Sequence, residues 1–422
     1  MLPTRRATAA AWASPLVCEA AALARNVVLA RLLGVEEMGK LMLLALVLRL
    51  AEMASDLSIE RLLAQADDGG SLRLQRELHA VAAARGIVVA LLMVAIAVPV
   101  ASFAGGAVSA ASVAALALSP LLRGFAHLDH RRMERAFDYG PTLVVEGGAA
   151  AAMLAAAPLA GILVGNHDAL VAVVLVQAVA LVALSHAVAR RRWRVAPVRA
   201  AFVRVVRFGS PLLANAALLF LIVQGERLVV TAFYDWAAVG LFAIAAQIAL
   251  LPALVAGRAA QALLLPLFRR ARSDGTLART ARAAHLAYAG LAIVYLAAFG
   301  FLAPHAVGLL YGDAFVPGGA LVWALGVAAA VRIARSPLSQ LAVALGRTDI
   351  PARANLHRLA GLAVAVVLAA AGAPLWAIAA AGALGELAAC AAAARLTHAE
   401  MARRGLADLP ARHAALASGA TA

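Results

Sequence analysis

The sequence predicts an all-α integral membrane protein, with about twelve transmembrane helices in two pseudo-symmetric six-helix lobes and both termini in the cytoplasm. Of its 422 residues, 64% are hydrophobic and 14% are charged, and the mean hydropathy is +0.89. In a soluble protein about half of the residues are apolar and about a quarter are charged. Apolar runs of about 20 residues, long enough to cross a bilayer as a helix, recur along the whole chain. The sequence therefore leaves no stretch for a soluble domain.

Glycine, proline and clusters of charge bound the predicted spans. The first six are expected near 11–33, 40–63, 81–103, 106–128, 139–163 and 169–189. After a basic stretch, six more are expected near 208–233, 237–268, 284–303, 318–345, 357–372 and 375–396. The predicted organisation is an N-terminal lobe at 1–194, a basic cytoplasmic linker at 195–207, a C-terminal lobe at 208–396 and a cytoplasmic tail at 397–422.

Arginine is concentrated in alternate loops. In total 28 arginines lie before the first span or after an even-numbered span, whereas the other loops hold at most Arg31 and Lys40. Short loops rich in arginine and lysine stay on the cytoplasmic side. The distribution predicts that both termini are cytoplasmic, as in a multi-pass protein of a prokaryotic inner (plasma) membrane. The net charge of +15 thus reflects membrane topology and gives no indication of nucleic-acid binding.

The two halves of the sequence look like copies of each other. The tripeptide Ser-Pro-Leu occurs in predicted spans one, four, seven and ten, beginning at Ser14, Ser119, Ser210 and Ser336. With one gap, Arg25 and Gly39 of the first half align with Arg227 and Gly240 of the second. Because each half holds an even number of spans, the copies share one orientation, and a central path is expected between the lobes.

The motifs of several soluble enzymes and metal sites are incomplete or missing in this sequence, which excludes those functions. The stretch GVEEMGKL fits the glycine and lysine pattern of a phosphate-binding loop, but Leu41 stands where that loop needs Ser or Thr. Cys18 and Cys390 have no partner at the spacing of a disulfide or metal site and are interpreted as packing residues. His127 and His130 are interpreted as interfacial polar residues. We expect no cofactor, no bound metal and no enzyme activity.

The second predicted span carries a stripe of charge. Arg49, Glu52, Asp56 and Glu60 are spaced at i, i+3, i+7 and i+11, which places them on one face of a continuous helix. Ionisable residues inside a span are costly unless they face protein or water. The stripe indicates either the wall of a water-accessible cavity or a salt-bridge ladder that only locks this helix to a neighbour.

Further charges in the spans predict a cationic lumen and an ion-coupling site. Arginine binds phosphate oxygens through a planar, bidentate group. The arginines expected to line the lumen are Arg25, Arg49, Arg227, Arg258, Arg332 and Arg335, of which Arg25 and Arg258 could instead lie at the interface. Such a lumen fits an anionic cargo such as a diphosphate-linked lipid, with Arg227, Arg332 and Arg335 holding the diphosphate. Candidates for coupling to H+ or Na+ are Glu19, Glu52, Asp56, Glu146 and Glu386.

Three motifs carry a resemblance to a known family: ARLLGVEEMGKL from Ala30, SDLSIER from Ser55 and RFGSPLLAN from Arg207. Over residues 10–395 the sequence resembles Wzx-type polysaccharide flippases of the multidrug/oligosaccharidyl-lipid/polysaccharide (MOP) exporter superfamily. That family has an aromatic residue where this chain has Met38. The resemblance implies a V-shaped, MATE-like pair of lobes. By alternating access they would move an undecaprenyl-diphosphate-linked oligosaccharide to the outer leaflet. It also implies membrane lipids and other polysaccharide-assembly proteins as partners.

Other functions remain open on the sequence. A multidrug or lipid II exporter of the same superfamily would share every helix and differ in the lumen. A membrane glycan polymerase or ligase would need a large external loop, and the longest one predicted, at 304–317, is short for such a site. A scaffold that does not transport would fit if the charged stripe is only a salt-bridge ladder.

Overall fold

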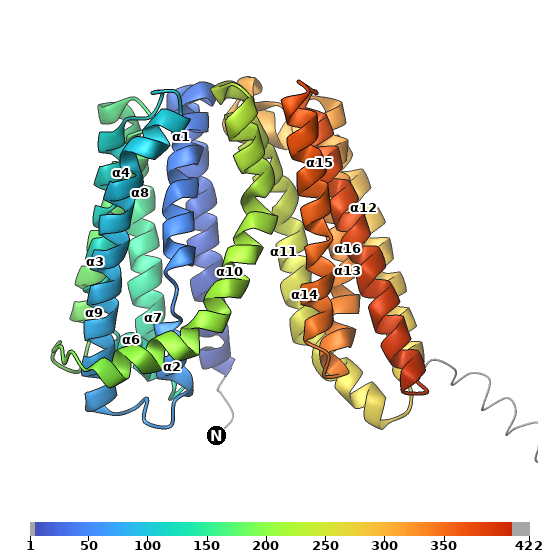
Figure 1. Ribbon diagram of the computed structural model, residues 1–422, viewed down its shortest axis with the longest axis horizontal. Coiled ribbons are helices and arrows are strands. Elements are labelled where there is room, and N and C mark those ends of the chain that lie inside the picture. Colours follow the sequence, from blue (N-terminus) through green and yellow to red (C-terminus); the bar gives the residue numbers. More distant parts are fainter. Residues whose placement is uncertain (1–4, 407–422) are drawn as a thin grey trace, which may run out of the picture. The chain divides into compact units, whose positions relative to one another are not determined.

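The computed structural model describes residues 5–406, including the side chains of 14–210, 213 and 220–406 (Figure 1). Every regular element in this part of the chain is a helix. The chain divides into two compact units. We call them the N-terminal unit, which comprises Met1–Gln224 and Asp235–Gly240, and the C-terminal unit, which comprises Gly225–Tyr234 and Leu241–Ala422.

The N-terminal unit is a bundle in which α8 packs between α1 and α9, and α3 packs on α4 and α5. Its helices are α1 (Arg5–Ala54), α2 (Ile59–Gln65), α3 (Leu72–Phe103), α4 (Ala110–Leu116), α5 (Leu118–Arg123), α6 (Asp129–Glu134), α7 (Gly140–Thr142), a π-helix (Leu143–Gly147), α8 (Gly148–Val164), α9 (Ala169–Ala187) and the first part of α10 (Arg199–Phe233).

The C-terminal unit is a second helical bundle, in which α13 packs against α12 and α16, and α15 packs against α16. Besides the end of α10 it holds most of α11 (Trp236–Ser273), then α12 (Leu277–Tyr311), a short 3-10 helix (Asp313–Phe315), α13 (Gly319–Ala344), α14 (Asp349–Leu356), α15 (Arg358–Ala370) and α16 (Leu375–Arg403). Phe268, Leu277 and Leu341 are among the buried residues where α11, α12 and α13 meet.

Eight helical stretches in the described part of the chain are long and apolar enough to cross a membrane. They are Leu72–Phe103, Gly140–Val164, Ala169–Ala187, Trp236–Ser273, Leu277–Tyr311, Gly319–Ala344, Asp349–Ala370 and Leu375–Arg403. Large apolar side chains on them point outward, such as Leu91 on α3, 65% exposed, and Phe301 on α12, 70% exposed. Extensive exposed apolar surface of this kind is stable in hydrocarbon and not in water. The chain is a multi-pass membrane protein.

Two predicted spans lie in one long helix that changes direction at a glycine. α1 covers the predicted span 11–33 and much of the next, and Gly34 between them has a φ of +81°, which glycine adopts without a steric cost. Just beyond, Gly39 contacts the first turn of α11, which belongs to the same unit. A Cβ atom on Gly39 would fall 1.9 Å from the carbonyl oxygen of Trp236, and one on Gly240 would fall 2.3 Å from that of Val35. The glycines that the sequence aligns between its halves therefore touch each other.

The prediction of one continuous helix over 40–63 is wrong. α1 ends at Ala54, and α2 begins only at Ile59. The Ser55 hydroxyl donates to the Ala51 carbonyl oxygen at 2.7 Å, and the Asp56 carboxylate accepts the amide of Ser58 at 2.8 Å. Serine and aspartate side chains compete in this way with helical hydrogen bonds, and they end the helix at the S-D-L-S stretch.

The basic segment predicted as a linker is helical from Arg199 onward and packs on the N-terminal unit. Val205 is fully buried among Ile59, Leu63 and Leu78, because its apolar side chain completes that cluster. The division between the two compact units falls inside α10, after Gln224. At the other end, α16 runs to Arg403, so that the segment predicted as a tail from 397 begins as helix; 407–422 lie outside the described residues.

Candidate functional site

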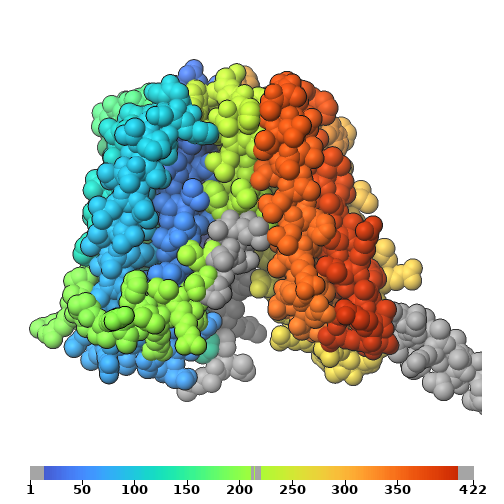
Figure 2. All heavy atoms as spheres, in the orientation of Figure 1, coloured from blue at the N-terminus to red at the C-terminus, as the bar shows by residue number. Residues whose placement is uncertain are grey.

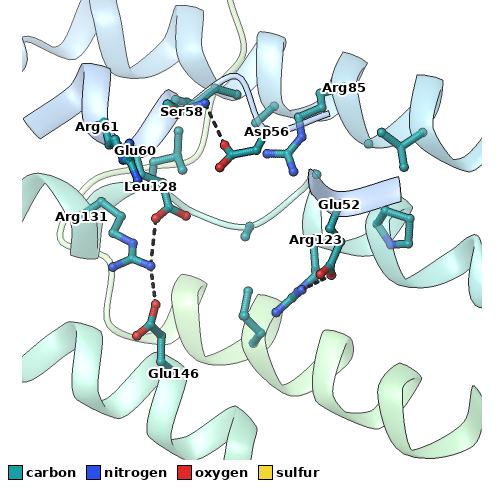
Figure 3. Close-up of a pocket in the computed structure, with 18 of the residues that line it drawn as sticks. Glu52, Asp56, Ser58, Glu60, Arg61, Arg85, Arg123, Leu128, Arg131 and Glu146 are labelled. Atoms are coloured by element: carbon teal, nitrogen blue, oxygen red, sulfur yellow. Dashed lines mark hydrogen bonds and ion pairs between the residues drawn. The ribbon is translucent and has the colours of Figure 1, made fainter. Parts of the chain in front are cut away.

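The N-terminal unit contains a charged cavity of about 530 Å³ (Figure 3). Its wall is built by α1, α2, α3, α5, α6, the π-helix and α9. The charged side chains that line it are Arg49, Glu52, Asp56, Glu60, Arg61, Arg85, Arg123, Arg131 and Glu146. Five arginines and four carboxylates thus face one space within a membrane-spanning bundle, where each charge needs a partner or water.

The predicted stripe of charge lines this cavity, although it does not lie on one helix. Arg49 and Glu52 are on the last turns of α1, Asp56 is in the break that follows, and Glu60 is on α2. The break turns the chain so that α2 presents Glu60 to the same space from another direction (Figure 3). A continuous intrahelical ladder is therefore excluded, because the helix that would carry it ends at Ala54.

Glu52 is paired with an arginine of another helix. The Arg123 guanidinium, at the end of α5, donates to the Glu52 carboxylate at 2.5 Å (Figure 3). The pair is only partly buried, since the Arg123 side chain is 36% exposed and that of Glu52 is 23% exposed. The cavity therefore contains an ion pair that is accessible to a ligand or an ion.

Arg131 on α6 is the centre of a second cluster, in which three carboxylates surround one guanidinium. Its nitrogens lie 2.9 Å from Glu60 and 2.8 Å from Glu134, and it also donates to Glu146. With all three carboxylates ionised, this group would carry two uncompensated negative charges. Ser14 on α1 donates a further hydrogen bond to Glu146.

Glu146 occupies an unusual turn of its helix. Residues Leu143–Gly147 form a π-helix between α7 and α8, so that this turn holds one residue more than an α-helical turn. Such wide turns are frequent at functional sites. The π-helix places Glu146 in the cavity beside Arg131, while α8 continues as a regular helix (Figure 3).

Three arginines of the cavity have no carboxylate within ion-pair distance among the described residues. They are Arg49, Arg61 and Arg85; of these, Arg85 makes one long hydrogen bond, 3.4 Å, to the Ser55 hydroxyl. A guanidinium without a carboxylate partner is free to bind a ligand anion. The cavity thus has an anion-binding part next to the carboxylate cluster around Arg131.

A buried polar cluster supports α6, and its member His130 lines the cavity. His127 and His130 are 1% and 5% exposed, so both are buried within the protein. The Asp129 carboxylate accepts hydrogen bonds from Arg132 at 2.6 Å, the Arg190 amide at 2.8 Å and Gln75 at 3.1 Å. Although burial alone would raise the pKa of Asp129, these bonds lower it to about 2. Burial and the neighbouring Arg131 lower the pKa of His130 to about 4, so this histidine is neutral at pH 7.

The C-terminal unit contains the inverse arrangement, one carboxylate surrounded by three arginines. Glu386 on α16 is 2% exposed and lies 2.8 Å from Arg332 Nε, 2.9 Å from Arg358 and 3.5 Å from Arg335. Arg335 also donates to the side chain of Asn355 at 2.8 Å. The structure thus places Arg332 and Arg335, two of the predicted diphosphate ligands, on a carboxylate of the protein.

The remaining predicted site residues lie elsewhere. Arg25 donates to the neighbouring Asn26 side chain and to the Met153 sulfur, and Arg227 donates to the Ala243 carbonyl oxygen at 3.4 Å. Glu19 and Arg258 are exposed, and neither lines the cavity.

Sequence reasoning misses several central residues. Arg61, Arg85, Arg131 and Arg358 are among the 28 arginines that predict the topology, and nothing in the sequence shows that they point inward. Arg123 lies inside the predicted span 106–128, so the rule applied to other intramembrane charges would have found it.

The fold is similar to the folds of solved membrane transporters. The structure is similar to a multidrug resistance MATE family transporter of the MOP superfamily in its inward-facing conformation, with a TM-score of 0.68 and 12% identity over 91% of this chain and 94% of that one. It is also similar to the lipid II flippase MurJ in an inward closed conformation, with a TM-score of 0.65 and 12% identity over 92% of this chain and 87% of that one.

At the level of sequence, residues 28–318 match the model of a family described as polysaccharide biosynthesis protein. The chain belongs to this family. No curated protein sequence matches the chain. The resemblance to the MOP superfamily that the sequence motifs indicated is confirmed by the family and the fold.

Proposed function

We propose that the protein is a flippase that moves a lipid-diphosphate-linked oligosaccharide from the inner to the outer leaflet during synthesis of a cell-surface polysaccharide. The family links the chain to polysaccharide biosynthesis, and its fold is shared by a lipid II flippase and by multidrug transporters. The observation that carries the proposal is the charged cavity of the N-terminal unit, because a polar, partly cationic space within a membrane bundle suits an anionic, hydroxyl-rich cargo.

In this proposal the arginines of the cavity bind the diphosphate. Arg49, Arg61 and Arg85 line the cavity without a carboxylate partner among the described residues, so binding an anion there breaks no ion pair. The Arg123–Glu52 pair and the side chain of Ser58 offer hydrogen-bond donors and acceptors for sugar hydroxyls. The predicted role of Arg332 and Arg335 in holding the diphosphate remains a prediction, and it would require the cargo to compete with Glu386.

We place ion coupling at the carboxylates around Arg131. Uptake of H+ or Na+ would neutralise part of the excess negative charge of Glu60, Glu134 and Glu146 and would weaken the contacts that join α2, α6 and the π-helix. Alternating access requires such a link between ion binding and helix packing. Glu386 has three arginines around it and no excess negative charge to attract a cation, so we favour Glu146 over Glu386.

The proposal includes twelve spans, with both termini and the basic segment at 190–207 in the cytoplasm of a prokaryotic cell. In this orientation the arginine-rich end of the N-terminal unit meets the inner leaflet, where a lipid-linked precursor would be loaded.

Transport by reconstituted protein tests the proposed function. Proteoliposomes receive a fluorescent lipid-diphosphate-linked oligosaccharide, and a membrane-impermeant quencher reports its movement between leaflets. We expect Arg49→Gln and Arg61→Gln to slow flipping severalfold. Arg73→Gln is the matched control, because the Arg73 side chain on α3 is 85% exposed and outside the cavity. Vesicles that export cationic drugs but leave the lipid-linked oligosaccharide in place would instead show a multidrug exporter.

A further inference from the structure

The arginine-rich segment at 190–207, which joins α9 to α10 and includes the first turns of α10, lies across one end of the N-terminal unit, over α2 and α6 (Figures 1 and 2). It contains seven arginines between residues 190 and 207 and becomes helical at Arg199. Its inner side is firmly held: the Ala196 amide donates to the Arg76 carbonyl oxygen at 3.0 Å, and His79 contacts the Arg194 carbonyl oxygen at 3.0 Å. Further along, Ala201 and Val205 are buried.

The outer side of the same helix is both apolar and basic. Phe202 is 51% exposed and Val203 is 54% exposed, and Arg199 and Arg207 are exposed beside them. Helices with an apolar and an arginine-bearing side lie in the interface between headgroups and hydrocarbon. The position of this segment at the end of a membrane-spanning bundle fits that location.

A groove of about 480 Å³ opens between this helix and α2. Its lining is apolar at Leu62, Ala200, Val203 and Phe208 and basic at Arg204 and Arg207. The two arginines differ in their partners. Arg204 is held by both carboxylate oxygens of Asp68, at 2.7 and 2.8 Å, whereas Arg207 has no ion pair among the described residues. The groove therefore combines an apolar wall with one uncompensated guanidinium.

We propose that this groove binds an anionic phospholipid of the surrounding membrane. Arg207 holds the phosphate of the headgroup, and the upper part of one acyl chain lies along Leu62, Val203 and Phe208. A guanidinium group matches phosphate oxygens in a bidentate geometry, and basic segments next to a membrane attract anionic lipids. Because Asp68 already compensates Arg204, the preference for an anionic headgroup depends mainly on Arg207.

Lipid retention by the purified full-length chain tests this site. The protein is titrated in mild detergent with phosphatidylglycerol or phosphatidylcholine, and bound lipid is counted by native mass spectrometry. We expect one phosphatidylglycerol to be retained in preference to phosphatidylcholine, and Arg207→Gln to weaken its retention roughly tenfold, as the loss of a charge-assisted contact predicts. Arg199→Gln is the matched control, an exposed arginine of the same helix that does not line the groove.

Three results would overturn the proposal. Equal losses in Arg199→Gln and Arg207→Gln would show general attraction to the basic segment. Equal retention of the two phospholipids by the unaltered protein would show that the headgroup charge is not recognised. Displacement of phosphatidylglycerol by a small amount of an isoprenoid diphosphate would show a site for the carrier lipid. The measured lipid retention does not depend on flipping activity, so this test is separate from that of the proposed function.

Discussion

The contact between Gly39 and Gly240 gives a sharp prediction about stability. Replacing Gly39 with alanine places a methyl group 1.9 Å from the carbonyl oxygen of Trp236, and an ordinary contact of this kind needs at least 3.4 Å. The two backbones must therefore move apart by about 1.5 Å, since a peptide oxygen cannot rotate away like a side chain. Overpacking of this kind costs roughly 1–3 kcal/mol or more. Gly240→Ala meets the Val35 carbonyl oxygen at 2.3 Å and should behave alike.

The assay is heating of the detergent-solubilised protein followed by size-exclusion chromatography, which gives an apparent melting temperature. Gly257→Ala is the control, because Gly257 is also on α11 and has open space where its Cβ would be. Alanine there should leave stability unchanged or raise it, by up to about 1 kcal/mol, through its better helix propensity. The double variant Gly39→Ala/Gly240→Ala should lose less than the two losses combined, because one separation of the backbones relieves both clashes. A Gly39→Ala protein that melts together with the Gly257→Ala control would refute the close contact.

Four further predictions follow from the charged groups and the topology. A single cysteine at Ser273, in a chain without the two native cysteines, should stay unlabelled by an impermeant reagent in intact cells; labelling would reverse the proposed orientation. Asp56→Asn keeps an oxygen that can cap Ser58 but removes the charge, so flipping in vesicles should fall while expression is kept. Glu386→Gln removes the carboxylate that Arg332, Arg335 and Arg358 share and should reduce folded protein in chromatography far more than Arg332→Gln, since removing one partner of a buried ion pair costs about 3–5 kcal/mol. Between pH 7 and pH 5, the free energy of unfolding of the native protein should fall more than that of His130→Gln. The expected difference is about 2 kcal/mol.

The sign of the pH effect follows from the lowered pKa of His130. In the unfolded chain this histidine takes up a proton near pH 6.5, whereas in the folded protein it resists protonation down to about pH 4. Its contribution to stability is therefore complete above pH 6.5 and is lost as the pH falls towards 4. Equal pH dependence of the native protein and His130→Gln would show that another group is responsible.

The sequence was a good guide to the helices and a partial guide to the site. Apolar runs mark the helices because a span must satisfy its own backbone hydrogen bonds, and this requirement is local. The spacing of Arg49, Glu52 and Asp56 predicts that they share one face of a single helix. All three line the same cavity, but the helix ends before Asp56. The S-D-L-S stretch contained the signal for that break, in side chains that bond to their own backbone.

The partners of the charges could not be read from the sequence. Glu386 and Arg332 are 54 residues apart, and Arg123 and Glu52 are 71 apart, so only packing brings them together. The arginines of loops and those of buried clusters look the same in a composition count, so the sequence indicates only a topological role for Arg131 and Arg358. An arginine between two spans can serve both purposes.

The π-helix at Glu146 also means that the direction of this carboxylate could be changed without moving the helices on either side. A wide turn holds one residue in excess, so deleting a single residue within Leu143–Gly147 can convert it to an α-helical turn while both flanking stretches keep their packing. The carboxylate would then leave Arg131 without any change in its chemical identity. A deletion of one residue would thus give a variant that differs from the native protein mainly in the direction of the Glu146 carboxylate. No side-chain replacement can provide this change.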